Sequence, residues 1–531
     1  MSSAELTEAQ LRELFDLRDL VDELIEEGLV KRWSVSEMLG ALLPRIGEQL
    51  AATAAWVETY GEDLNLRAFL WGQDAGKPPS IPDKADVWAR TSEEKRERVA
   101  IATGEHVVIA QHLDVAGEWF GRAGLVCAPG AEANRLQEAL NAVCEVLDNY
   151  LFSIKAMREK HLVMMRLGNA LRHRVLGEGV KQAVEVLADA IPVHKLVLVY
   201  RAEEGTGKTL HIQLYEGKEL KVDTLSNEDE SFSTLQMLGR DYLAGDSPDF
   251  LKELGVADAQ EEVLINGITK SVVVGKVVVT ATHGTFNTYD RELLAAFAGF
   301  IRQRIVDFSK EWRSLAYSFR PADVARLLQT EDYERRYLAP REEVVAILYV
   351  DIAGFTRLSE TKLKTPARVA ELVETWSRDA VELVWTHGGV FDKMVGDCII
   401  ALFGPPFYDE NEGERLARAI ECARDVRAMT NLLAERKMFD HLKEEGVHVS
   451  TGVNLAPLFV GQFGPNSNFT GFSSGMNNTA RLQGCAGKDE ILVMADALKK
   501  LPDNAGFEFG DERSAPVKNV AEPLRFRTLV K

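Results

Sequence analysis

The chain is poor in cysteine and has no long apolar run. Its five cysteines are scattered over 531 residues without a CxxC pair, which fits a reducing cytoplasm with most of them as small core residues. No apolar segment approaches the roughly 20 residues that span a bilayer. The first residues are acidic and amphipathic, unlike a signal peptide. We therefore expect a cytoplasmic protein with no membrane span.

Positive charge is also scarce. The 62 Lys and Arg residues are outnumbered by 82 Asp and Glu, which gives a net charge of −20. This balance opposes non-specific binding to nucleic acid or anionic lipid, so no nucleic-acid partner is expected. An anionic substrate must then be met by a local site or by metal ions. The length and a hydrophobic content of 46% predict a globular protein with several domains.

The first 150 residues predict a helical segment followed by a mixed domain. Residues 1–35 carry Leu11, Leu14, Leu17, Val21 and Leu24 at helical spacing, which fits one core helix or a dimerising helix. From residue 36 to 150 we expect a long helix through Ala54, a second long helix at the end, and between them strands at 66–71, 107–111 and 124–127.

A second segment with the same order of predicted elements starts near residue 166. It has strand-like runs at 195–200, 210–215 and 271–282, and a helix from Asp290. Helix, antiparallel strands and closing helix is a plan that resembles sensory GAF domains, most closely in VGKVVVTATHGTFNTYDRELLAAFAGF. The resemblance implies GAF-like domain 1 at 36–150, a connecting helix at 151–165 and GAF-like domain 2 at 166–305. It also implies an unidentified small-molecule ligand.

Some GAF domains bind cyclic nucleotides through an Asn-Lys, Phe, Asp-Glu signature. Lys276, Phe286 and Asp290 fit three of these places, but Gly275 and Arg291 replace the Asn and the Glu. A strand glycine and a core phenylalanine explain the segment better, so no ligand is named.

Two helical stretches carry apolar residues at 4,3,4,3 spacing. Such a seam favours a partner helix, most simply the same helix of a second copy, although each seam could also pack on its own domain. We expect a parallel homodimer with a coiled-coil linker at 306–340. One seam comprises Val143, Leu147, Tyr150, Ile154, Met157, His161 and Met164, and the other Leu294, Ala298, Ile301, Ile305, Phe308, Trp312, Leu315 and Phe319.

The C-terminal part predicts an α+β domain, with the whole chain an α+β multidomain protein. The expected elements are a strand at 344–350, a helix at 365–386, a hairpin at 389–403, a helix at 411–437 and strands at 447–453 and 459–463. This βαββαβ order predicts a ferredoxin-like sheet with helices on one face.

Two acids stand at the ends of apolar runs in this domain. Asp351 follows Ile347–Val350, and Asp397 precedes Cys398–Phe403. Carboxylates at strand ends can meet a metal ion without leaving charge in the core, so we predict a metal site. Gly354, Phe355 and Thr356 form a glycine turn before a helix, where free amides can hold phosphate.

The segments VDIAGFT and FDKMVGDCIIALFG resemble the catalytic domain of class III adenylate/guanylate cyclases, over residues 341–531. The resemblance implies two divalent metal ions per site, Mg²⁺ or Mn²⁺, held by Asp351, Asp397 and the backbone carbonyl of Ile352. In that family a Lys with Asp or Thr reads adenine, and Glu with Cys reads guanine. The matching residues are Lys393 and Thr470, which favour ATP because a lysine donates to a ring nitrogen and a hydroxyl accepts from the exocyclic amine.

The same resemblance assigns three further side chains. Asn477 and Arg481, four apart on one helix face, would orient the ribose and stabilise charge on the α-phosphate. Lys518 would bind the terminal phosphates, although Asn519 replaces the usual glycine after it. The flank Ser473–Gly475 and the pair Ala456-Pro457 also depart from the family pattern.

The expected function is adenylate cyclase activity, which converts ATP to 3′,5′-cyclic AMP and pyrophosphate at sites shared across a homodimer. The GAF-like domains would regulate it. A guanylate cyclase and a catalytically silent dimeric sensor or scaffold are the alternatives. A diguanylate cyclase is disfavoured because the hairpin Gly388–Asp392 lacks that family's central acid pair.

Overall fold

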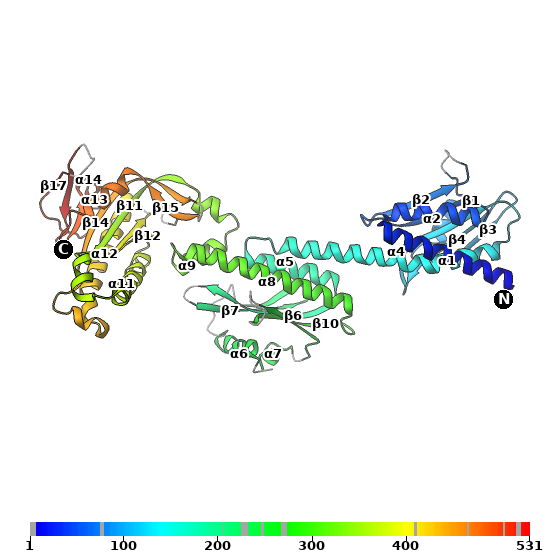
Figure 1. Ribbon diagram of the computed structural model, residues 1–531, viewed down its shortest axis with the longest axis horizontal. Helices are drawn as coiled ribbons and strands as arrows, with labels where there is room; N and C mark the ends of the chain where they lie inside the picture. The colour runs from blue at the N-terminus through cyan, green and yellow to red at the C-terminus, as the bar shows by residue number, and fades with distance from the viewer. Residues whose placement is uncertain are drawn as a thin grey trace. The chain divides into compact units, whose positions relative to one another are not determined.

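The computed structural model describes residues 7–74, 79–204, 207–224, 232–245, 249–256, 258–266, 273–407, 411–464, 467–502, 505–516 and 522–531. These residues form two compact units, Met1–Arg166 and Leu167–Lys531, which are described separately below. Elements are labelled as in Figure 1.

The first unit is built on a five-stranded antiparallel sheet in the order β2-β1-β5-β4-β3. Its first two helices begin at capping boxes, with Thr7 and Ser34 as N-caps, which satisfy backbone N–H groups that the helix leaves unpaired. The elements are α1 (Glu8–Lys31), α2 (Val35–Gln49), β1 (Ala52–Tyr60), β2 (Leu66–Gly72), α3 (Lys84–Arg90), β3 (Val99–Ala102), β4 (Val107–Val115), β5 (Glu118–Cys127) and α4 (Ala133–Ala170).

The prediction of a helix through Ala54 was wrong. Helix α2 ends at Gln49, Ala51 has a left-handed φ of 52°, and the segment from Ala52 is β1, an inner strand of the sheet. The alanines of this strand have helical propensity, but pairing with both β2 and β5 outweighs that weak local preference. Ala54, Ala55 and Trp56 are all buried.

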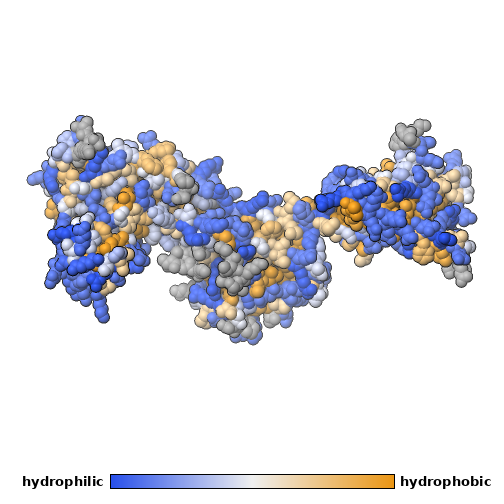
Figure 2. All heavy atoms as spheres, viewed as in Figure 1, coloured by the Kyte–Doolittle hydropathy of each residue, from blue (hydrophilic) through white to orange (hydrophobic). Residues whose placement is uncertain are grey.

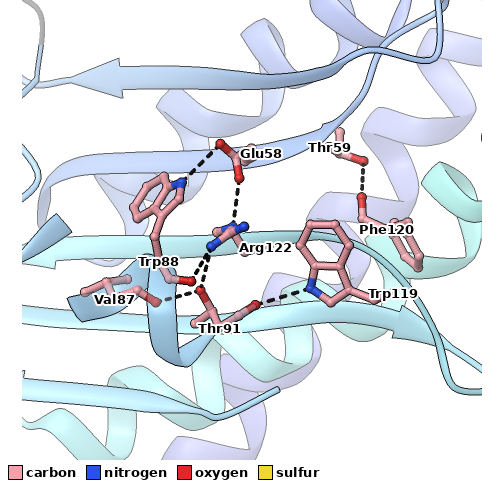
Figure 3. A network of polar contacts seen from close by, with 8 residues as sticks. All are labelled: Glu58, Thr59, Val87, Trp88, Thr91, Trp119, Phe120 and Arg122. Carbon is pink, nitrogen blue, oxygen red and sulfur yellow. Dashed lines mark hydrogen bonds and ion pairs between the residues drawn. The ribbon is translucent and has the colours of Figure 1, made fainter. Parts of the chain in front are cut away.

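A buried polar network joins α3 to the sheet of this unit (Figure 3). Arg122 on β5 lies 2.8 Å from Glu58 on β1 and donates to the carbonyl oxygen of Trp88 at 2.7 Å. The indole of Trp88 donates to Glu58 at 3.1 Å, and that of Trp119 to the carbonyl oxygen of Thr91 at 3.2 Å. The opposite charges of Arg122 and Glu58 compensate each other inside this unit, and both indole N–H groups have acceptors.

The second unit begins with another five-stranded antiparallel sheet, in the order β8-β7-β6-β10-β9. As in the first unit, the first strand pairs with the last. The elements are α5 (Leu176–Ala190), β6 (Val193–Glu204), β7 (Gly207–Glu216), β8 (Glu219–Asp223), α6 (Ser233–Ala244), α7 (Asp249–Glu253), β9 (Glu261–Asn266), β10 (Val273–Ala281), α8 (Thr288–Ala316), α9 (Pro321–Leu328) and a short π-helix (Glu334–Leu338).

The second apolar seam does not face outward. All eight of its residues, from Leu294 to Phe319, are at most 5% exposed within a single copy of the chain, because α8 packs on α5, α9 and the sheet. This stripe therefore serves its own domain, contrary to the expected coiled coil. In the first seam Val143 and Leu147 are buried as well, whereas Met157 on the middle of α4 is 65% exposed.

The C-terminal domain has the predicted βαββαβ core. The four core strands lie in the order β12-β13-β11-β14, all antiparallel, and β16, β18 and β17 extend the sheet. Helices α11 and α12 cover one face and share its largest core cluster (Figure 1). The elements are β11 (Arg341–Ile352), α10 (Phe355–Leu358), a π-helix (Ser359–Leu363), α11 (Pro366–Thr386), β12 (Val390–Val395), β13 (Cys398–Phe403), α12 (Glu412–Asn431), 3₁₀ turns (Leu433–Glu435, Lys437–Leu442), β14 (Val449–Phe463), β15 (Asn468–Phe472), α13 (Ser474–Gln483), β16 (Ile491–Met494), α14 (Ala495–Leu498), β17 (Arg513–Ala515) and β18 (Leu524–Thr528).

Two element predictions in this domain were wrong in detail. The strands expected at 447–453 and 459–463 are one strand, β14, which pairs with β11 from Val449 to Val460 and carries Pro457 opposite Val344. The helix expected to reach Lys437 ends at Asn431 and is followed by 3₁₀ turns. The continuous strand depends on pairing with β11, and the helix end depends on where the chain turns after Asn431. Neither can be recognised from a local sequence pattern.

The surface agrees with the acidic, polar composition. Hydrophilic residues cover most of the face shown in Figure 2, with separate apolar patches between them. Across the described ranges, every helix is too short or too polar to serve as a membrane span.

Candidate active site

The two predicted metal acids lie side by side at one edge of the central strands. Asp351 is near the end of β11 and pairs in register with Cys398 at the start of β13, immediately after Asp397. Gly396, in the turn between β12 and β13, has a left-handed φ of 64°, a conformation that glycine adopts without strain. The turn thus brings Asp397 to the end of the neighbouring strand.

Each carboxyl of this pair has a raised pKa. Burial raises the pKa of Asp351 to about 6, and the neighbouring Asp397 carboxyl adds to the rise. Burial also raises the pKa of Asp397. Burial, with Asp351 and Asp397 nearby, raises the pKa of the Cys398 thiol to about 12, so this cysteine is a neutral thiol. The carboxylate oxygens, and not this thiol, are therefore the groups here that suit a divalent cation.

These donors fit a hard divalent cation whose coordination is completed by other oxygen atoms. Two like charges share one half-buried place, and a bound cation would relieve their repulsion. Within the part of the chain that the structure describes, no group of three or more His, Cys, Asp or Glu side chains could hold a metal ion. Backbone carbonyls such as that of Ile352 and substrate phosphates would have to supply the remaining ligands.

The sequence did not reveal the amide beside the acids. Gln483, at the end of α13, donates to Asp351 at 3.5 Å and to the hydroxyl of Ser450 at 2.8 Å. Gly452 on β14 allows this close approach, because a Cβ there would lie 2.7 Å from the backbone nitrogen of Gln483. Gln483 follows Arg481 by only two residues, yet its partner on β11 is 132 residues away.

The two residues predicted to read the base are in contact. Lys393 on β12 and Thr470 on β15 are 77 residues apart, and the Lys393 Nζ lies 3.3 Å from the Thr470 hydroxyl oxygen. Asp392, also missed by sequence reasoning, is 3% exposed, and its carboxylate lies 3.5 Å from the Lys393 Nζ. Burial raises the pKa of Asp392, while Thr470 and Lys393 act in the opposite direction. An ion pair and a hydroxyl contact thus position the lysine.

Asn477 and Arg481 both lie on α13, and their environments differ. Asn477 is exposed, whereas Arg481 is half-buried and donates to Asn478 at 3.3 Å. Among the described residues, no hydrogen bond or ion pair joins Arg481 or Asn477 to Asp351 or Asp397. The acids and this helix face are separate groups within one chain.

The remaining predicted residues flank the acids or lie outside the described ranges. Gly354 has a left-handed φ of 72° and directly precedes the four-residue helix α10, which contains Phe355 and Thr356. Lys518 lies outside the described residues.

The cyclic-nucleotide signature considered for the upstream domain has a structural explanation. Asp290 forms a capping box with Asn287, and Phe286 is buried. Lys276 pairs with Glu262 at 3.0 Å, and a Cβ at Gly275 would lie 2.7 Å from the carbonyl oxygen of Val199. The preference for a strand glycine and a core phenylalanine over a ligand site fits these contacts.

The segment between α8 and α9 touches both strands that carry Lys393 and Thr470. The carbonyl oxygen of Ser318 accepts from the backbone N–H of Phe391 at 3.0 Å and from the indole of Trp385 at 3.1 Å. The ring of Phe319 lies 5.2 Å from that of Phe469. Phe391 is two residues before Lys393, and Phe469 is directly before Thr470.

Comparison with known proteins places this domain in a class. Residues 338–527 match the family described as adenylate and guanylate cyclase catalytic domain. The uncharacterized proteins Rv1319c and Rv1318c of Mycobacterium tuberculosis are 29% and 25% identical over 198 residues, which are 36% of this chain and 34% of each protein. The chain thus matches about a third of the length of these curated relatives.

Similar solved structures include cyclases of both specificities. The adenylyl cyclase CyaB from P. aeruginosa is 21% identical over 36% of this chain and 97% of that chain, with a TM-score of 0.33. The guanylate cyclase domain of RhGC from Catenaria anguillulae, in complex with GTP, is 16% identical over 36% and 98%, with a TM-score of 0.31. The family match by itself shows that residues 338–527 form a class III nucleotide cyclase catalytic domain. The comparisons leave the choice between adenine and guanine open.

Proposed function

We propose that the chain is an adenylate cyclase that converts ATP to 3′,5′-cyclic AMP and pyrophosphate. The observation that carries this proposal is the contact between Lys393 and Thr470, whose polar atoms lie 3.3 Å apart. A lysine donor beside a hydroxyl acceptor complements the ring nitrogen and the exocyclic amine of adenine. Guanine presents a carbonyl oxygen in place of that amine and would leave the hydroxyl without a donor.

Asp351, Asp397 and the carbonyl of Ile352 would hold two divalent metal ions, Mg²⁺ or Mn²⁺. When bound, such ions lower the pKa of a coordinated hydroxyl and neutralise phosphate charge. In the reaction the ribose 3′-oxygen forms a bond to the α-phosphorus, the bond to pyrophosphate breaks, and the hydroxyl proton passes to solvent. Arg481 stabilises charge on the α-phosphate and Asn477 orients the ribose.

Gly354, Phe355 and Thr356 offer backbone N–H groups to the phosphates, and Lys518 is proposed to bind their terminal end. Gln483 restrains the Asp351 carboxylate through its 3.5 Å contact. Its second bond, to Ser450, fixes the amide itself.

The active form is proposed to be a homodimer with two composite sites. One chain supplies Asp351 and Asp397, and the other supplies Lys393, Thr470, Asn477 and Arg481. Two observations support this. In the described part of one chain, no hydrogen bond or ion pair joins the two acids to Asn477 or Arg481, and apolar side chains are exposed on the hairpin and on β14 and β15. These are Val395, Phe459 and Phe472, which are 60%, 49% and 55% exposed, and such patches mark interaction surfaces.

The two upstream α/β domains are proposed to be GAF-like sensors that regulate the cyclase in the cytoplasm. Their support is the shared plan of a five-stranded antiparallel sheet with its first strand beside its last. The direct contacts of Ser318 and Phe319 with the catalytic strands give such regulation a route.

The test is turnover of ATP and GTP by the full chain with Mg²⁺ or Mn²⁺. We expect cyclic AMP as the main product, and Asp397→Ala should lower its formation at least about 100-fold because a two-metal site loses a ligand. Asp440→Ala, which changes an acid that is 57% exposed on the same domain, is the matched control and should keep full activity. Preferential turnover of GTP would overturn the adenylate assignment, and an active Asp397→Ala chain would overturn the metal assignment.

A further inference from the structure

A cavity of about 460 Å³ lies between the second sheet and the two helices that lead to the catalytic domain. Its walls come from the start of α5, from β7 and β8, from α8 and from α9. A volume of this size is within the usual range of small-molecule sites. None of the residues assigned to catalysis lines it.

Two buried polar atoms at this cavity lack partners. Gln213 is 1% exposed and Trp312 is 4% exposed, and both line the cavity. The Gln213 side-chain oxygen and the Trp312 indole nitrogen find no hydrogen-bond partner among the residues that the structure describes. An unpaired buried polar group is destabilising, so two of them at one cavity point to an occupant that pairs with both.

The cavity is on the face of the sheet that α5 and α8 cover. Gln213 alternates along β7 with Ile212 and Leu214, which belong to the core cluster on the opposite face, under α6 and α7. Its amide nitrogen donates to Asp223 at 3.3 Å, which fixes the amide with its oxygen as the remaining acceptor. The site thus offers one acceptor, Gln213, and one donor, Trp312.

The charges around the cavity argue against a phosphorylated ligand. The lining holds one lysine, Lys181, and two carboxylates, Glu178 and Asp223. No arginine lines it among the described residues, so positive charge is not in excess. The N-terminus of α5 has no side-chain cap at Val175, which leaves backbone N–H donors that a neutral ring acceptor can use. The rings of Phe308 and Trp312 provide an aromatic wall.

We propose that this cavity binds an uncharged planar heterocycle of about nucleobase size. A ligand N–H donates to the Gln213 oxygen, a ligand acceptor takes the Trp312 N–H, and occupancy changes cyclase turnover. The last point rests on the proposed function.

The route to the catalytic domain is short. Ala325 and Leu328 on α9 line the cavity. In the connection between α8 and α9, Ser318 contacts Phe391 and Phe319 contacts Phe469. These two phenylalanines lie on the strands that carry Lys393 and Thr470. A ligand that favours one position of α9 therefore biases the segment that supports Lys393 and Thr470.

The binding test uses calorimetry on the full chain with four probes. Adenine carries both a donor and an acceptor edge, indole has only the N–H, quinoline has only the acceptor, and AMP adds a phosphate to adenine. We expect adenine to bind at least about 5-fold more tightly than indole or quinoline, because each of these loses one hydrogen bond. AMP should not bind at this cavity.

Substitutions at the cavity test whether adenine binds there. Gln213→Met and Trp312→Phe each remove one polar partner and should weaken adenine binding about 5-fold. Gln303→Met, on the exposed side of α8, is the matched control and should not. Because adenine could also enter the catalytic site, Lys393→Glu is measured too, and binding at the cavity should not respond to it.

Two results would overturn the proposal: no binding of any uncharged probe, or binding that Lys393→Glu weakens and Gln213→Met and Trp312→Phe leave unchanged. Turnover is measured separately with saturating ATP. A change caused by adenine and lost in Gln213→Met supports the coupling through α9. Binding without any change in turnover refutes the coupling and leaves the site, and an inactive wild-type chain that still binds adenine refutes the proposed function alone.

Discussion

The Lys393 Nζ lies 3.3 Å from the Thr470 hydroxyl oxygen, which joins β12 to β15 across 77 residues of sequence. The carboxylate of Asp392, which is 3% exposed, lies 3.5 Å from the Lys393 Nζ. The lysine is therefore held in place before any nucleotide arrives. For the base selection proposed above, this lysine is a pre-organised donor.

Substitution of Lys393 and Thr470 together should change the preferred nucleotide from ATP toward GTP. Lys393→Glu with Thr470→Cys replaces the donor and hydroxyl with the side chains that read guanine in the cyclase family. We expect the ratio of ATP to GTP turnover to fall at least about 100-fold, because polar groups mismatched to adenine would be left unpaired. Chromatography of cyclic AMP and cyclic GMP measures the ratio. Lys499→Glu, which alters an exposed lysine, serves as the control, and an unchanged ratio in the double variant would remove this pair from base selection.

Mixing two inactive chains should restore activity if the sites are shared. A heterodimer of Asp351→Ala and Arg481→Ala chains has one site with both defects and one intact site. In a random mixture we expect roughly a quarter of wild-type activity, since half of the dimers each keep one of two sites. The measurement is cyclic AMP formation after co-expression and verified heterodimer formation. Inactive heterodimers would show that each chain builds its own site.

The acid pair should make stability depend on pH. The pKa of Asp351 is raised to about 6 in the folded chain, whereas an unfolded Asp has a pKa of about 3.9. The folded state therefore binds the proton more tightly, and stability is lost as pH rises from about 4 to about 6. Without metal ions, Asp351→Asn should stabilise the chain at pH 7–8 by on the order of 1 kcal/mol after solvent screening.

Thermal denaturation at several pH values, with a chelator present, measures this difference. The gain should shrink to nothing below about pH 4, where the wild-type carboxyl is protonated in both states. Added Mg²⁺ should stabilise the wild type and not the variant. A gain that is the same at pH 4 and pH 8 would contradict the assigned electrostatics.

The buried ion pair of the first unit should be strongly coupled. Arg122→Met leaves Glu58, which is 15% exposed, without its charged partner 2.8 Å away, and should cost about 3 kcal/mol. Adding Glu58→Gln removes the unpaired charge and keeps an acceptor for the Trp88 indole. We therefore expect a coupling free energy above about 1 kcal/mol in the double-mutant cycle.

Urea denaturation followed by tryptophan fluorescence gives these values. Arg67→Met breaks an ion pair whose side chains are 60% and 41% exposed, and it should change stability by less than about 0.5 kcal/mol. Additive effects of the two buried substitutions would contradict the network drawn in Figure 3.

The catalytic domain was the most predictable part of the chain. Asp351 and Asp397 each end or precede an uninterrupted apolar run, and that local pattern alone places a carboxylate at a strand end. The spacing of apolar residues then predicts the chain order βαββαβ. The four core strands of that order form the sheet β12-β13-β11-β14. Gly396 lies in the turn between Lys393 and Asp397, with a left-handed φ of 64°.

The upstream elements were less predictable, because pairing outweighed local preference. The alanine-rich start of β1 suggested helix, yet this segment is an inner strand that pairs with β2 on one side and β5 on the other. The α8 seam suggested a partner helix from a second copy, yet its residues are buried on their own domain. A heptad stripe records only that one helix face is apolar, and any apolar surface can cover it.

The sequence by itself determined the chemistry: which carboxylates, lysine, hydroxyl and guanidinium are present, and which lie at strand ends or on one helix face. Only the tertiary structure decided which of them meet. Gln483 reaches Asp351, Lys393 meets Thr470, Ser318 contacts Phe391, and Gln213 and Trp312 border one cavity. The physical reason is that local periodicity follows from neighbouring side chains, whereas contacts between residues far apart in the chain depend on the packing of the whole domain.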